Sequence, residues 1–133
     1  MNASTFIIAT HVAQTLAERA DIVFARLGAF AQDEGRTLAA IARLCDRPEI
    51  GHHLAGLEAL HRDPAGDDNP TIRAAIRHLE ALQGILADLP PDPEVTGLIR
   101  ESDRTLVKSL DAAIRYAGAR VEDHLRAMRH LLR

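Results

Sequence analysis

Seven histidines are distributed through a chain of 133 residues, and their types and spacing raise the question of a metal site. Glu58 and His61 have the Glu-x-x-His spacing of carboxylate-bridged di-metal helical proteins, because residues three apart on a helix point the same way. Those sites need two such motifs and a glutamate from each remaining helix. The sequence contains no second Glu-x-x-His, so a di-metal site is not predicted.

A mononuclear site between helices would use histidines that fall on or beside apolar helix faces, namely His53, His61, His78 and His124. Glu58 or Glu80 would then supply a carboxylate ligand. In the alternative interpretation each histidine lies at a boundary, with one ring face buried and one nitrogen in water. His52 and His53 are adjacent and diverge by about 100° on a helix, so they do not chelate one ion from one face. We adopt the boundary interpretation and predict neither metal nor cofactor, with a metal- or small-ligand-binding bundle as a second alternative.

Nucleophilic catalysis has little support in the sequence. The single cysteine, Cys45, excludes an intrachain disulfide and a thiolate zinc site, and no base or strong positive field lies near it in sequence. We therefore expect Cys45 to be a small packed apolar residue. Glycine-rich phosphate loops, Gly-x-Ser-x-Gly and His-Glu-x-x-His are all missing from the sequence. The prediction is a protein that is not an enzyme.

Charge is unevenly distributed along the chain. Residues 58–103 contain ten acidic and four basic side chains, whereas residues 115–133 contain five arginines and two acidic side chains. The candidate partner-binding residues are Arg115, Arg120, Arg126, Arg129 and Arg133. Alternatively, these cations complement the dipole at the end of a helix. A nucleic-acid partner is not expected, because Tyr116 is the single aromatic residue among them in the sequence and the isoelectric point is about 6.1.

Residues 37–61 nevertheless have the look of a helix-turn-helix, and this supports an alternative function as a DNA-binding regulator. His52 and His53 would lie near the start of the second helix and meet base edges, while Arg43 and Arg47 would meet phosphates. The resemblance is loose, because proline occupies the turn and the segment that follows is acidic.

The elements that must position these residues are predicted to be helices. Hydrophobic residues make up 47% of the chain and aromatic residues only 3%, so the core must consist of alanine and aliphatic side chains. We predict a first helix over residues 4–34, ended by Gly35. A second helical stretch over 37–62 is broken at Pro48, which leaves a short helix over 38–45 and another that begins at Pro48.

Two further helices are expected after the turn-forming segment 63–69. The third covers about residues 70–89 and the fourth is one long amphipathic helix over 93–133, with apolar residues spaced by threes and fours. Four main helices with short connections favour an up-down-up-down antiparallel bundle. A fourth helix of about 60 Å would overhang the rest, and we expect a homodimer to cover it.

The chain is expected to form a single domain over residues 1–133. The apolar stretch at residues 6–9 is too short for a signal peptide, and nothing approaches about 20 consecutive apolar residues, so a cytoplasmic protein without a membrane span is predicted. The expected function is a non-enzymatic helical protein–protein interaction module: an adaptor, assembly component, chaperone or small inhibitor with a protein partner.

Overall fold

A computed structural model of the chain describes residues 3–62, 68–91, 93–95 and 99–132, and for residues 3–17 and 68 it describes the backbone alone. The elements within these ranges are α1 (Ala3–Leu44), α2 (Pro48–Arg62), α3 (Asp68–Asp88), the 3₁₀ turn η1 (Glu101–Asp103), α4 (Arg104–Lys108) and α5 (Leu110–Leu131). None of the described residues forms a β-strand. The predicted all-α fold is confirmed.

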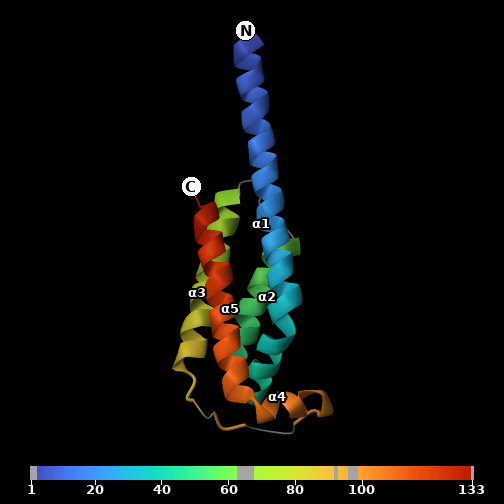
Figure 1. Cartoon of the computed structure of the whole chain (residues 1–133), viewed down its shortest axis with the longest axis vertical. Coiled ribbons are helices and arrows are strands. Elements are labelled where there is room, and N and C mark those ends of the chain that lie inside the picture. Colours follow the sequence, from blue (N-terminus) through green and yellow to red (C-terminus); the bar gives the residue numbers. More distant parts are fainter. Residues whose placement is uncertain (1–2, 63–67, 92, 96–98, 133) are drawn as a thin grey trace.

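Four long helices lie side by side around a common core (Figure 1). Helix α1 packs against α2 and α5, and α3 packs against the same two helices, so the four close into a ring. Aliphatic side chains fill the centre, and the most deeply buried are Leu38, Ile41, Ile50, Ile72, Leu79, Leu82, Val121, Leu125 and Met128. No described helix is long and apolar enough to cross a membrane.

The first helix continues past the predicted stop at Gly35 and ends only at Leu44. The separate helix predicted over 38–45 is therefore wrong. A glycine inside a helix costs about 1 kcal/mol, whereas burying a leucine or isoleucine side chain stabilises by about 1.5–3 kcal/mol. Leu38 and Ile41 are both fully buried in the core, so continuing the helix through Gly35 is the more stable outcome.

The predicted break at Pro48 is confirmed, and its geometry explains why the chain reverses there. Asp46 adopts a left-handed backbone conformation with φ 51° directly after α1. The Arg47 N–H donates to the Ala42 carbonyl at 2.9 Å and the Asp46 N–H donates to the Arg43 carbonyl at 3.4 Å, which is the Schellman arrangement. Pro48 then begins α2, where its missing N–H is not needed.

The long helix predicted over residues 93–133 is wrong. Residues 93–95 and 99–100 are not helical, and the chain crosses one end of the molecule before η1 and α4 begin (Figure 1). Asp103 holds this crossing in place, because its buried carboxylate accepts a hydrogen bond from Arg43 of α1 at 3.1 Å. A second break occurs at Ser109, whose φ of −126° separates α4 from α5. The described part of the chain therefore has five α-helices rather than four main ones.

The part of the molecule that projects is the start of α1, not the C-terminal helix as predicted. Helix α1 is 42 residues long, and its first turns extend alone beyond the ends of α3 and α5 (Figure 1). Just below this projecting part, Arg19 donates a hydrogen bond of 2.7 Å to Asn69 at the start of α3. We call residues 3–17 the arm; at 1.5 Å per residue the arm is about 22 Å long.

Candidate functional site

The arginines predicted to bind a partner are paired within the chain. The ion pairs are Arg115–Asp111 at 2.9 Å, Arg120–Glu34 at 2.9 Å, Arg126–Glu122 at 3.2 Å and Arg129–Glu80 at 3.4 Å. Arg133 lies outside the described residues. Two of these pairs join neighbouring turns of α5, and the other two tie α5 to α1 and α3. The four described arginines therefore have a role in the fold, which the charge count along the sequence did not predict.

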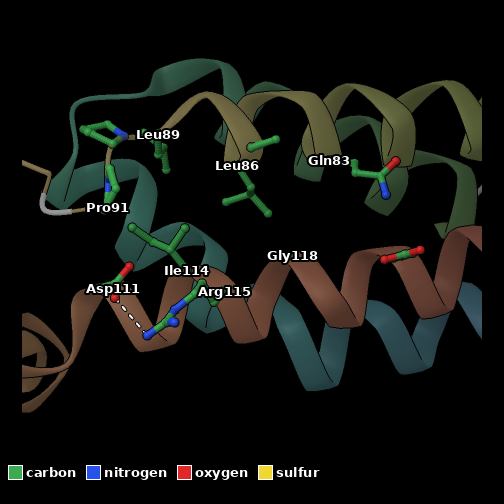
Figure 2. A pocket seen from close by; sticks show the side chains of 11 residues that line it. Gln83, Leu86, Leu89, Pro91, Asp111, Ile114, Arg115 and Gly118 are labelled. Carbon is green, nitrogen blue, oxygen red and sulfur yellow. Dashed lines mark ion pairs between the residues drawn. The ribbon is translucent and has the colours of Figure 1, made fainter.

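One of these arginines borders a pocket of about 560 Å³ between α3 and α5. Figure 2 shows Leu86 and Ile114 inside this pocket, with the Asp111–Arg115 ion pair on the α5 side. Its lining residues include no histidine, serine or cysteine, and its two carboxylates, Asp111 and Glu122, are both paired with arginines of α5. It is an apolar surface depression with a charged rim.

The residues of the helix-turn-helix alternative are placed differently from such a motif. Helix α2 runs back along α1 as a hairpin, with Ile50 and Leu57 buried. Arg43 is exposed but paired with Asp103, His53 is half-buried against α3, and Arg47 and His52 are exposed. A recognition helix must stand out from its neighbours to enter a groove. This geometry does not favour DNA recognition through residues 37–61.

Two of the predicted histidines meet between α2 and α3. The Nδ1 atoms of His53 and His78 are 3.0 Å apart, and the ring centroids are separated by 5.3 Å. Burial lowers the pKa of both imidazoles, and the charge of neighbouring His52 lowers them further. For His78 the charges of His53 and Arg77 act in the same direction. Both rings are therefore neutral at pH 7, with one ring nitrogen of each free of a proton.

Glycines make room for histidines at two helix contacts. A Cβ atom at Gly56 would lie 2.5 Å from two ring atoms of His78, so His78 rests directly on the backbone of α2. A Cβ at Gly28 would lie 3.0 Å from His61 Nε2, and the His61 ring also contacts Phe24 with centroids 4.4 Å apart. His61 and Glu58, the pair with di-metal spacing, line a separate pocket of about 570 Å³ between α1 and α2.

A buried polar group joins α1 to α5. Glu34 is 4% exposed, and the Arg120 Nε donates to its Oε1 at 2.9 Å. This hydrogen bond and the carboxylate charge raise the pKa of Arg120. His124 Nε2 lies 4.0 Å from the same oxygen, which is too far for a hydrogen bond. The carboxylate is thus held by arginine and only approached by histidine.

His124 is 2% exposed, and neither of its ring nitrogens has a hydrogen-bond partner among the described residues. The Phe30 ring meets it edge-on with centroids 5.0 Å apart. Burial lowers the pKa of His124, and the positive charge of Arg26 lowers it further. Two polar atoms in an apolar setting make this the least satisfied buried side chain of the described core.

The remaining candidates for chemistry are the thiol of Cys45 and the possible metal ligands. Cys45 is free, 6% exposed, and burial raises the pKa of its thiol, so it packs as an apolar side chain at neutral pH. In the part of the chain that the structure describes, no three His, Cys, Asp or Glu side chains are grouped to hold a metal ion. The four histidines considered as metal ligands therefore do not share one site. Of these four, His53 and His78 are in direct contact through their Nδ1 atoms.

Sequence reasoning missed the partners rather than the residues. The sequence indicates a candidate function for Arg120 and for His124, but for Glu34 it predicts only that the first helix ends there. The available signal was spacing, because Glu34 follows Phe30 by four residues in the buried seam of α1. A carboxylate at a core position needs a buried cation or hydrogen-bond donor on a facing helix.

Comparison with known proteins adds no relationship: no protein-family profile, curated protein or solved structure matches the chain. The class defined by the structure is an all-α protein with a projecting helical arm and a histidine pair between α2 and α3.

Proposed function

We propose that the chain is a non-enzymatic protein–protein interaction module that uses the arm of α1 to pair with a second copy. In this proposal α1, α2, α3 and α5 form an up-down-up-down antiparallel bundle that serves as a rigid base. The observation that supports it is the extension of α1 beyond every other helix in Figure 1. The four arginines of α5 considered above are already paired within the chain, so the arm is a stronger candidate for docking than these arginines.

The arm continues an apolar seam that is buried lower down in α1. Val23, Leu27 and Phe30 are each 3% exposed, and they follow one another at intervals of four and three residues. The same intervals run backward in sequence through Ala20, Leu16, Ala13 and Ala9. Positions at these intervals share one face of a helix. Ala20 is already exposed, which marks the point where the other helices stop covering the seam.

A second copy is the occupant that this seam fits best. A two-fold interface joins the same surface on both subunits, and two antiparallel arms would bring equal lengths of the seam together. Ile22 is 53% exposed and Phe24 is 49% exposed at the base of the arm, so apolar surface also flanks the seam. Covering this surface would remove it from water, which is the main driving force of association.

Light scattering coupled to gel filtration tests the proposal. The full chain should elute with twice its mass of 14.5 kDa, and a chain that starts at residue 18 should be monomeric. The shortened chain should keep its thermal melting point when both are measured as monomers, because the described core begins at Val23. A full chain that stays monomeric at about 100 µM, where a dimer of any useful affinity would form, contradicts the proposal.

A point substitution separates docking from folding. Ile22→Glu places a charge on an exposed side chain, so it should weaken the dimer by at least about tenfold without changing monomer stability. Ala31→Glu is the matched control, because Ala31 is also exposed on α1 but lies away from the arm. Equal weakening by both substitutions would place the interface elsewhere.

A further inference from the structure

We infer that His53 and His78 form a two-histidine binding site for a divalent transition-metal ion, with Cu²⁺ as the preferred ion. The site uses the contact between α2 and α3 and does not depend on the arm or on its pairing. The two Nδ1 atoms approach to 3.0 Å, closer than the centres of their rings by more than 2 Å. This contact is an N–H···N hydrogen bond in which one Nδ1 donates to the other, and an ion bound at both Nδ1 atoms would take the place of the shared proton.

The separation of the two nitrogens matches the bite of one ion. Imidazole nitrogens lie about 2.0–2.1 Å from such an ion, so two of them are about 2.9 Å apart at a right angle and about 3.4 Å apart at a tetrahedral angle. The observed 3.0 Å is near the right-angle value. Right angles between nitrogen ligands are typical of Cu²⁺ and Ni²⁺, and Cu²⁺ binds most tightly in the general order of divalent ions.

The surrounding structure holds one of the two ligands in place. His78 rests on Gly56, where any Cβ would approach the ring to 2.5 Å. Both histidines are half-buried, so they are fixed by packing but remain reachable from solvent. Because no third His, Cys, Asp or Glu joins them among the described residues, the other coordination positions are filled by water or by a small ligand.

Titration calorimetry and electron paramagnetic resonance of the full chain with Cu²⁺ test this site. We expect one tight Cu²⁺ per chain, with a spectrum that shows two coordinating imidazole nitrogens. His53→Gln and His78→Gln should each weaken binding by at least about tenfold and remove one nitrogen from the spectrum. Circular dichroism melting of the metal-free variants checks that both remain folded.

His130→Gln is the control, since His130 is exposed near the end of α5 and belongs to neither half of the pair. It should leave both the Kd and the spectrum unchanged. Gly56→Ala keeps both ligands but displaces His78, and it should weaken binding. The site would be refuted by Cu²⁺ binding that survives His78→Gln, by equal losses in His130→Gln, or by no binding at all. An unchanged Kd in Gly56→Ala would count against the held geometry.

Discussion

Replacing His124 by leucine should make the protein more stable, although it removes a side chain from the centre of the core. His124 is 2% exposed, and its two ring nitrogens have no hydrogen-bond partner in the described part of the chain. Leaving buried polar groups unsatisfied costs about 1–3 kcal/mol. Leucine is close to histidine in size and fits beside Leu125 and Met128, which are also buried.

The loss that opposes this gain is the edge-on contact with Phe30, which is worth about 0.5–1.5 kcal/mol. The net expectation at pH 8 is a stabilisation of about 1 kcal/mol, or about 3–4 °C in melting temperature. The Glu34–Arg120 hydrogen bond should be unaffected, because Arg120 and not His124 satisfies the carboxylate.

The gain should grow as the pH falls. Burial holds the pKa of folded His124 below its ordinary value of 6.5, and the charges of Arg26 and Arg120 lower it while those of Glu34 and Asp33 partly oppose them. The unfolded chain therefore takes up the proton first, and the wild-type protein loses stability as the pH falls from about 6.5 toward the lowered pKa. His124→Leu removes this loss.

Urea unfolding followed by circular dichroism at pH 8 and at pH 5.5 measures both effects. The control is His130→Leu, because His130 is exposed on the same helix. A His124→Leu variant that is less stable than the wild type at pH 8 would refute the reasoning about unsatisfied nitrogens. A stability difference that does not widen at pH 5.5 would refute the reasoning about the pKa.

Two further predictions concern backbone and core. Asp46→Gly should stabilise the protein by about 0.5 kcal/mol. Glycine adopts the left-handed conformation with φ 51° without strain, and this gain exceeds the entropic cost of a more flexible unfolded chain. An unchanged or lower urea midpoint would contradict this. Leu110→Asp should destabilise by roughly 4 kcal/mol or more, because Leu110 is 5% exposed and an unpaired carboxylate would be buried at the start of α5. A Leu110→Asp variant with unchanged melting and unchanged hydrodynamic size would mean that this face of α5 is not packed.

Local signals in the sequence were sufficient for the helical class and for several helix limits. Proline at the start of α2 and the Asn69-Pro70 pair near the start of α3 each act within one turn of backbone, so they are readable without the rest of the molecule. Among the described side chains, apolar residues spaced by threes and fours are buried in both α1 and α3, namely Val23, Leu27 and Phe30 and then Ile72, Ile76, Leu79, Leu82 and Leu86.

Tertiary contacts decided the parts that were mispredicted. Val95, Ile99 and Leu106 keep helical spacing in the sequence. In the structure Val95 packs against the core from the crossing segment, Leu106 packs from α4, and Ile99 is 42% exposed. The Arg43–Asp103 ion pair that fixes this crossing joins residues 60 positions apart, and no local pattern announces it. Gly35 shows the reverse case, in which a local stop signal is outweighed by core burial further along the helix.

The histidine pair was only partly predictable for the same reason. Helical spacing placed His53 and His78 on apolar faces, but which residues face each other depends on the rotation of α2 against α3. Gly56 permits the observed rotation, because its missing side chain lets the His78 ring approach the backbone.

The bond between Glu34 and Arg120 spans 86 positions of sequence and closes the ring of helices. Hairpins between consecutive helices need only short loops, so α1 with α2 and α2 with α3 can associate quickly, whereas docking of α5 onto α1 carries a larger entropic cost. We therefore expect docking of α5 onto α1 to be a late step of folding and its release to be an early step of unfolding. Amide protons of α5 should exchange with deuterated solvent sooner than those where α1 meets α2.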